Sequence, residues 1–292
     1  VYPTAIRLGL LFSLDDLNKP FEDIIASLRA KGQEFSHILK MGRTQLQDAV
    51  PMTLGQEFHA FAATLEKDLA QINSIAPNTL NYMNLGGTAI GTGINTEYRY
   101  TQLAIQALSE ISQKNIQSAP DLIEATSDMG DFVLLSGLLK RTATKLSKIA
   151  NDLRLLSSGP RTGINEINLE ARQPGSSIMP GKVNPVIPEA LNLVCFQIIA
   201  NDLAVTLAAE AGQLQLNAME PLIAFKLFES IELLSRALVM FRTKCIDTVT
   251  ANAEHCKAQV ENSIGIVTAL NPYLGYETTT RIAKTANESG LS

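Results

Sequence analysis

Hydrophobic side chains recur at helical spacing along most of this chain. Thr53 and Gln56 have the spacing of a capping box, in which each side chain accepts a hydrogen bond from the other residue's backbone N–H. The apolar run that follows returns every three or four residues, which places its members on one face of a helix. These members are Phe58, Phe61, Leu65, Leu69, Ile72 and Ile75. The pattern therefore predicts a helix that begins just after Thr53.

The same spacing predicts several other long helices, with a bend at Pro20 in the first of them. The helix before residue 211 is apolar on nearly every face, which is typical of a helix surrounded by protein. Strands do not alternate with helices, so we expect no parallel sheet. The sequence predicts an all-α fold, a bundle of long helices that other subunits complete. The expected helices span residues 2–40, 121–156, 185–211, 221–249 and 253–270.

Few segments lack this periodicity, and functional residues are expected among them because binding sites concentrate in loops. The irregular segments are residues 40–53, 84–95, 159–184 and the tail after Asn271.

Composition fits a folded globular protein, because 46% of the 292 residues are hydrophobic and 18% are charged. The net charge of −5 and the absence of a basic block exclude a nucleic-acid or anionic-membrane surface. Neither a signal peptide nor a charge-free run of membrane-spanning length is present. The three cysteines and three histidines show no metal-ligand spacing, so we expect no metal, no cofactor and a reducing cytoplasm. Cys195, Cys245 and Cys256 are expected to be small buried groups.

The most informative segment is the polar loop at residues 175–185, Gly-Ser-Ser-Ile-Met-Pro-Gly-Lys-Val-Asn-Pro. Its glycines permit backbone conformations closed to other residues, so its N–H groups can enclose an anion. A serine here can act as a base only where the surroundings favour its alkoxide. The loop is not a phosphate-binding P-loop, because five residues separate its glycines and valine follows Lys182. The alternative is an ordinary turn before a helix.

Two polar residues at the end of this loop suit a carboxylate. Lys182 offers a full positive charge and Asn184 a directed donor, next to the N–H groups that begin a helix. Asn184 could instead cap that helix. Glu189 lies about one turn inside the helix and needs a partner if it is buried. A salt bridge and a supporting role in the site are equally compatible with its position.

Two further irregular segments are candidates for the site. In residues 42–51, Thr44 and Gln45 supply a hydroxyl and an amide that can recognise an amine or a carboxylate, although a simple interhelix turn has the same composition. Residues 84–95 contain four glycines without the spacing of a dinucleotide fingerprint. Close helix packing explains these glycines better than a ligand does.

Residues 175–185 resemble the signature loop of the aspartase/fumarase superfamily. Within it, other segments resemble the aspartate ammonia-lyase branch, and the resemblance extends from Val1 to Ser292. It implies a central helical-bundle domain at residues 1–270 and the start of a small C-terminal domain at residues 271–292. It also implies that an N-terminal domain with a Ser-Ser-Thr-Asn motif precedes Val1 in the whole protein. The matching segments are residues 42–58, 84–95, 151–160 and 208–217.

The resemblance implies five bundle helices per chain, packed into a twenty-helix homotetramer core with active sites shared between subunits. It implies reversible elimination of ammonia from L-aspartate to give fumarate through an enediolate. Ser176 is then the general base, and Ser177 with the loop N–H groups holds the β-carboxylate. Lys182 and Asn184 would bind the α-carboxylate, and Thr44 and Gln45 would lie near the amine.

Gln45 departs from many relatives, which have histidine there paired with a glutamate at the position of Glu189. An amide cannot accept or release a proton at physiological pH, so Gln45 cannot serve as an acid or base. This residue disfavours hydration as the main activity and leaves the leaving amine without an obvious proton donor. Fumarate hydratase and an inactive structural tetramer core remain the alternatives, the second because the Ser-Ser-Thr-Asn segment is missing.

Overall fold

The computed structural model describes residues 1–290 and divides the chain into two compact units. Unit 1 comprises residues 1–24, 64–149 and 189–240, and unit 2 comprises residues 25–63, 150–188 and 241–292. Both units are built mainly from helices, so the all-α fold predicted from the periodicity is confirmed. Most of the polar loop residues singled out by the sequence belong to unit 2.

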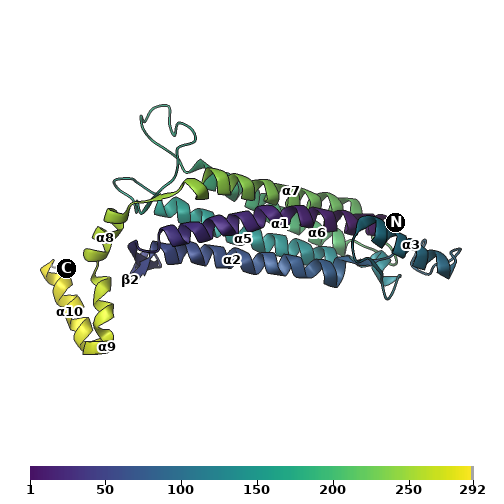
Figure 1. Cartoon of the computed structure of the whole chain (residues 1–292), viewed down its shortest axis with the longest axis horizontal. Helices are drawn as coiled ribbons and strands as arrows, with labels where there is room; N and C mark the ends of the chain where they lie inside the picture. The colour runs from purple at the N-terminus through teal and green to yellow at the C-terminus, as the bar shows by residue number, and fades with distance from the viewer. Residues whose placement is uncertain (291–292) are drawn as a thin grey trace. The chain divides into compact units, whose positions relative to one another are not determined.

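The α-helices range from four residues to the 33 residues of α1, and the longest are continuous (Figure 1). They are α1 (Tyr2–Glu34), α2 (Leu54–Ile75), α3 (Tyr98–Ser112), α4 (Glu124–Ser127), α5 (Gly130–Leu156), α6 (Val186–Glu210), α7 (Glu220–Lys244), α8 (Ala253–Glu261), α9 (Asn271–Leu274) and α10 (Tyr276–Ser289). A π-helical segment, η1 (Ala76–Leu80), follows α2, and two 3₁₀ helices are η2 (Ile246–Thr248) and η3 (Ile264–Leu270).

Strands are short and occur in pairs. They are β1 (Leu39–Thr44), β2 (Gln47–Thr53), β3 (Tyr82–Met83), β4 (Gln117–Ser118), β5 (Ile167–Asn168) and β6 (Thr250–Ala251). The pairs β1–β2 and β5–β6 are antiparallel. The pair β3–β4 is parallel, so the expectation of no parallel pairing is wrong at this two-residue ladder.

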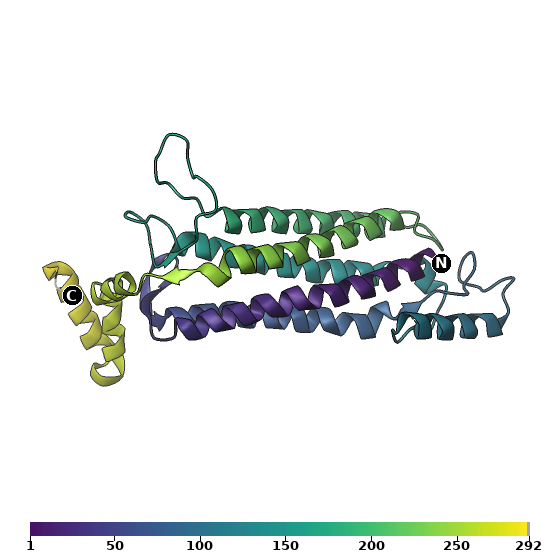
Figure 2. The ribbon, with the colours of Figure 1, turned by 45° about the horizontal axis from the view of Figure 1, so that its top comes forward.

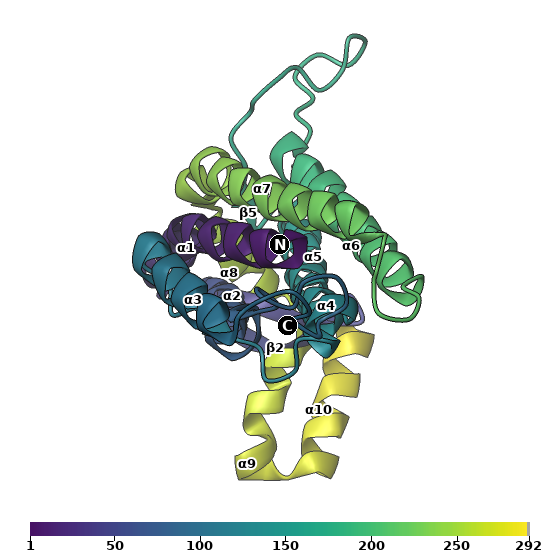
Figure 3. The ribbon, with the colours of Figure 1, turned by 90° about the vertical axis from the view of Figure 1, so that its right-hand side faces the viewer.

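In unit 1, long stretches of α1, α2, α5, α6 and α7 run side by side, as the end-on view in Figure 3 shows. Phe21, Leu65, Phe132 and Leu234 are fully buried between them. Ion pairs and hydrogen bonds fix the register of neighbouring helices. Asp68 on α2, 1% exposed, lies 2.5 Å from Lys145 Nζ and 3.1 Å from Arg141 Nε on α5. These contacts fix the position of α2 along α5, which apolar side chains alone do not determine.

The glycine-rich segment before α3 packs at backbone distance. A Cβ atom added to Gly91 would lie 2.3 Å from the Cα atom of Ile123, and Gly91 has a φ of +92°. Both observations require glycine at this position. Gly86 likewise leaves no room for a side chain beside Thr101. Close packing, which the sequence favoured over a dinucleotide site, therefore explains these two glycines.

The predicted start of α2 is confirmed in detail. The Thr53 N–H donates to Gln56 Oε1 at 2.9 Å, and the Gln56 N–H donates to Thr53 Oγ1 at 3.1 Å. This reciprocal pair is a capping box, and it satisfies N–H groups that the helix leaves without intrahelical partners.

Four of the predicted segments differ from the structure. Residues 40–53, expected to be irregular, form the β1–β2 hairpin. The helix expected from 121 to 156 is interrupted at Asp128, whose backbone is extended and whose side chain accepts from the Gly130 N–H at 2.8 Å. The helix expected over 253–270 breaks after Glu261. The tail after Asn271 contains α9 and α10 and is not irregular.

Helix α6 carries large apolar side chains on two faces. One face is buried in unit 1, and the other exposes Leu193, Phe196, Leu203 and Leu207. By length and hydropathy it is also the one helix in residues 1–290 that could cross a membrane. The core helix of an oligomer meets the same criteria. Its buried Asp202 accepts from Ser136 Oγ at 2.9 Å and pairs with Lys140 Nζ at 2.5 Å.

The three cysteines are buried and free, as expected from the sequence. Burial raises the pKa of the Cys195 and Cys245 thiols to about 12 and that of Cys256 to about 11.

At pH 8 we expect no more than about 0.1% of each thiol to be thiolate, the reactive form. An aromatic disulfide reagent should therefore titrate the three thiols only after unfolding in denaturant. Rapid reaction of any of them in the native protein would contradict this prediction.

Candidate active site

Ser176 accepts two backbone hydrogen bonds inside the polar loop between β5 and α6. The N–H groups of Ile178 and Met179 each donate to Ser176 Oγ at 3.2 Å. Donors directed at an oxygen stabilise negative charge on it. Half-buried Ser176 is therefore the serine of this loop whose Oγ receives backbone donors, in the local turn motif that serine commonly forms.

The two ends of the loop are closed by three hydrogen bonds. The Gly175 N–H donates to the Lys182 carbonyl at 2.9 Å, and Asn184 Nδ2 donates to the Gly175 carbonyl at 3.0 Å. The third bond runs from the Lys182 N–H to the Met179 carbonyl at 3.3 Å. A Cβ atom on Gly175 would lie 2.3 Å from the Lys182 carbonyl oxygen, so only glycine permits this closure.

This closure changes the role expected of Asn184. Its side-chain amide donates to the Gly175 carbonyl and does not cap α6. Helix α6 begins at Val186, one residue later than predicted, and the Val186 N–H donates to the Asn184 carbonyl at 2.9 Å. Asn184 therefore shapes the loop in this structure. Its amide keeps one further donor hydrogen for a ligand.

Ser177 and Lys182 are exposed on the same loop, which Figure 2 shows as a trace without regular structure leading into α6. In the described part of the chain, no hydrogen bond or ion pair engages the Lys182 ammonium. Glu189 lies half-buried in the first turn of α6. The loop therefore exposes the Ser177 hydroxyl and the Lys182 ammonium, and the glycines of the loop define its backbone geometry.

Thr44 and Gln45 lie at the turn of the β1–β2 hairpin. Thr44 pairs with Gln47 in the final rung, and Gln45 and Leu46 form the two-residue turn. Both turn residues have positive φ, +53° and +62°, as a type I′ turn requires. Residues other than glycine pay a conformational cost for this geometry, so the turn depends on its surroundings. Both predicted side chains are exposed at its tip.

A buried ionic cluster anchors this hairpin. Glu166, fully buried, accepts from Arg43 Nη1, and its Oε2 lies 2.7 Å from Lys40 Nζ. Lys40 also lies 2.6 Å from Glu57 Oε2. Opposite charges at these distances compensate one another's loss of water. The cluster thus ties the strand that carries Thr44 to residue 166, which lies in the irregular segment that leads to Ser176.

Sequence reasoning missed this cluster. Lys40, Arg43, Glu57 and Glu166 are scattered along the chain, and a lone glutamate in a polar segment resembles any solvated residue. A weak signal was available, because Lys40 and Arg43 flank apolar residues in a segment that reads as an alternating strand.

The structure does not bring the predicted residues into one site within a single chain. No hydrogen bond or ion pair joins Thr44 or Gln45 to residues 175–184 among residues 1–290. Ser176, Ser177, Lys182 and Asn184 share one loop, whereas Thr44 and Gln45 share a hairpin turn on the same unit.

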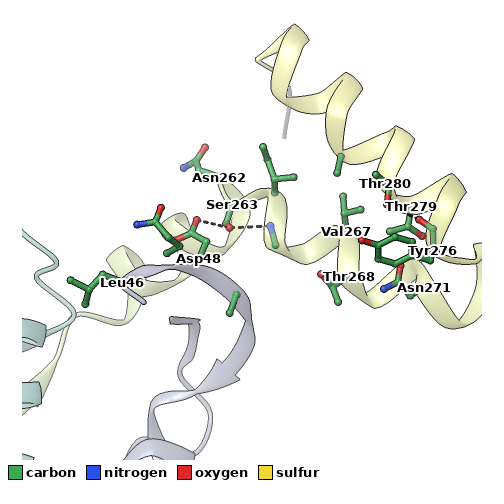
Figure 4. Close-up of a pocket in the computed structure, with 15 residues that line it drawn as sticks. Leu46, Asp48, Asn262, Ser263, Val267, Thr268, Asn271, Tyr276, Thr279 and Thr280 are labelled. Atoms are coloured by element: carbon green, nitrogen blue, oxygen red, sulfur yellow. Dashed lines mark hydrogen bonds between the residues drawn. The ribbon is translucent and has the colours of Figure 1, made fainter. Parts of the chain in front are cut away.

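A cleft of about 660 Å³ lies beside the hairpin turn (Figure 4). It runs between the turn, the end of α8, η3 and α10, and its walls carry mainly amide and hydroxyl groups. Among the described residues that line it, none is lysine, arginine or histidine. A dicarboxylate requires cationic or N–H partners, so this cleft does not suit one. Its acidic member, Asp48, accepts from Ser263 Oγ at 2.7 Å.

Residues 1–200 match the protein family described as lyase. The chain belongs to this lyase family. A relative from Pseudomonas canavaninivorans, named aspartate ammonia-lyase, is 70% identical over 99% of this chain and 61% of its own length. The aspartate ammonia-lyase of Escherichia coli K12 is 54% identical over 100% of the chain and 61% of its own length. The chain therefore spans less than two thirds of the lyases it matches.

Solved structures of this lyase family share the fold. The fumarate lyase:delta crystallin of Brucella melitensis, bound to cobalt, has a TM-score of 0.96 and 56% identity, over 100% of this chain and 63% of its own. A class II fumarase from Schistosoma mansoni has the same TM-score at 34% identity, over 99% of this chain and 64% of its own. The predicted superfamily fold is thereby confirmed.

Proposed function

We propose that the full-length protein is an aspartate ammonia-lyase, which eliminates ammonia from L-aspartate to give fumarate. The observation that carries this proposal is the pair of N–H donors on Ser176 Oγ in a loop closed by glycine. The difficult step is removal of a weakly acidic proton next to the β-carboxylate, which needs a strong base and donors directed at the developing charge. High identity to named aspartate ammonia-lyases supports the same reaction.

In this proposal each predicted residue has one task. Ser176 removes the proton as an alkoxide, and Ser177 with loop N–H groups binds the β-carboxylate as the enediolate forms. Lys182 and the remaining donor of Asn184 bind the α-carboxylate. Thr44 and Gln45 contact the amine, and Glu189 supports the start of α6. Closure of the loop over the substrate excludes water and favours the deprotonated serine. No metal or cofactor is required.

We propose that the active site is composite and forms in a homotetramer. In a single chain, no hydrogen bond or ion pair among the described residues joins Thr44 or Gln45 to the serine loop, and an apolar stripe on α6 is exposed. Leu193, Phe196, Leu203 and Leu207 repeat with heptad-like spacing, the pattern of helices that pack against other helices. Residues 271–292 would begin a small C-terminal domain after a central domain at residues 1–270. A cytoplasmic enzyme fits three free thiols.

The reaction is tested by incubating the full-length protein with fumarate, with and without ammonia. An aspartate ammonia-lyase consumes fumarate only when ammonia is present and produces L-aspartate. Production of malate without ammonia would instead identify a fumarate hydratase, the activity that the structural likeness to a class II fumarase raises. If neither product forms, the remaining interpretation is a structural tetramer core without catalytic activity.

Lys182→Ala is expected to weaken substrate binding. Removing a charged hydrogen-bond donor from a carboxylate costs about 1.5–3 kcal/mol, which corresponds to a rise in KM of about 10–100-fold. The measurement is KM for L-aspartate at fixed pH. Lys257→Ala, which removes an exposed lysine 3.8 Å from Glu261 on α8, is the matched control. An unchanged KM in Lys182→Ala would contradict the assigned role.

The tetramer is expected to dissociate when its α6 stripe is charged. Leu203→Glu places a carboxylate in the proposed helix–helix interface, where it cannot keep its water. Light scattering should report a tetramer for the original protein and a smaller species for the variant. Glu210→Gln, at the exposed end of α6, is the control. A monomeric original protein would contradict the composite site.

A further inference from the structure

Three polar residues lie in and just after α8. His255 and Gln259 are four residues apart in α8, a spacing that places them on one face of the helix, and Ser263 follows the helix as the N-cap of η3. All three bond to segments of unit 2 that carry or precede the proposed site residues. None of the three was expected from the sequence to have a role.

Gln259 joins β1 to the irregular segment before β5. Its Oε1 accepts from Arg43 Nη2 at 3.2 Å, and its Nε2 donates to the Ile164 carbonyl at 3.1 Å. His255 Nε2 lies 2.9 Å from the same carbonyl oxygen. Arg43 itself also bonds to Glu166, so α8 reaches the hairpin and residues 164–166 together.

Ser263 holds the other strand of the hairpin. Its side chain is buried, with 4% of the residue exposed, and Oγ donates to Asp48 Oδ2 at 2.7 Å while accepting from the Gly265 N–H at 3.1 Å. Figure 4 shows both bonds. A Cβ atom on Gly265 would lie 2.7 Å from the Ala49 carbonyl oxygen, so η3 and β2 approach at backbone distance.

The two contacts meet at one rung of the hairpin. Arg43 and Asp48 are cross-strand partners, and the next rung is Thr44 with Gln47. Gln259 therefore holds one end of the Arg43–Asp48 rung and Ser263 the other, and only the Thr44–Gln47 rung separates it from the turn. Gln45 adopts a positive φ without being glycine, and such a geometry persists only when its surroundings enforce it.

We propose that Gln259 and Ser263 are positioning residues that hold the Thr44–Gln45 turn in its substrate-binding geometry. This inference rests on the proposed function, because it assigns the turn to the substrate amine. Without these contacts the turn is free to move, and the proposed contacts of Thr44 and Gln45 with the substrate amine weaken. The contacts thus make the C-terminal part of unit 2 a determinant of substrate affinity, although neither residue touches substrate.

The test uses the full-length protein with the double variant Gln259→Leu/Ser263→Ala. We expect KM for L-aspartate to rise at least about tenfold, with a smaller change in kcat, because the turn and not the base is displaced. The single variant Ser263→Thr keeps the hydroxyl and should keep a KM close to that of the original protein. Asn262→Ala is the matched control, since among the described residues its side-chain amide donates only to the Ala258 carbonyl, at 2.8 Å.

A second readout does not depend on turnover. Hydrogen exchange of the amides in residues 43–49 should become at least about fivefold faster in the double variant and stay unchanged in Asn262→Ala. If the original protein does not convert L-aspartate, the proposed function fails and the exchange rates still test the positioning contacts. If it does convert L-aspartate but the double variant keeps its KM and its exchange rates, the positioning role is overturned and the proposed function stands.

Discussion

Ser176→Ala is expected to lower kcat for L-aspartate by about 10²–10⁴-fold, the usual contribution of a positioned general base. The variant loses the single oxygen that receives the N–H groups of Ile178 and Met179. The donors proposed for the two carboxylates stay in place. Fumarate should therefore bind the variant with a dissociation constant close to that of the original protein, measured by calorimetry.

The control for this variant preserves the backbone donors. Met179→Leu keeps the Met179 N–H that donates to Ser176 Oγ and conserves side-chain volume, so it should retain most of the rate. A Ser176→Ala variant with most of its activity would exclude Ser176 as the base. Loss of fumarate binding in that variant would show that the serine holds substrate instead.

Glu166→Ala is expected to destabilise the protein by up to about 3–5 kcal/mol, because it removes the fully buried counter-charge shared by the half-buried Arg43 and the buried Lys40, which keeps only Glu57. Glu166 is fully buried, and both cations reach it from β1. Urea unfolding at fixed protein concentration gives this difference from the midpoint and slope.

The matched control for Glu166 is an exposed ion pair nearby in the sequence. Glu170→Ala removes the partner of Arg172, 2.6 Å away, and solvent-exposed pairs of this kind contribute at most about 1 kcal/mol. Equal midpoints for Glu166→Ala and Glu170→Ala would mean that the cluster does not anchor the hairpin.

The sequence predicted local features best where neighbouring residues define them. The capping box of Thr53 and Gln56 is a three-residue pattern, and the structure reproduces both of its bonds. The loop at residues 175–185 was identified because its glycines and polar residues are contiguous. Helix α6 was identified by its continuous apolar character, which also explains its exposed stripe.

The sequence failed where geometry depends on distant residues. The hairpin was missed because its turn, Gln45 and Leu46, lacks the glycine or asparagine that usually marks positive φ. Contacts from Gln259 and Ser263, more than 200 positions away, hold the rung below it. The bond from the Asn184 amide to the Gly175 carbonyl was also missed, and the binding role of Asn184 stays a prediction.

Subunit complementation tests the composite site most directly. Ser176→Ala and Thr44→Ala variants of the full-length protein are each expected to be nearly inactive. Suppose that each site takes its serine from one copy and its turn from another. Tetramers formed at random from equal amounts of the two variants then contain some sites in which both residues are intact. These are about a quarter of all sites, so activity should recover to about a quarter of the original value. Hybrids of confirmed mixed composition with no recovered activity would place both residues in the same copy and contradict the account.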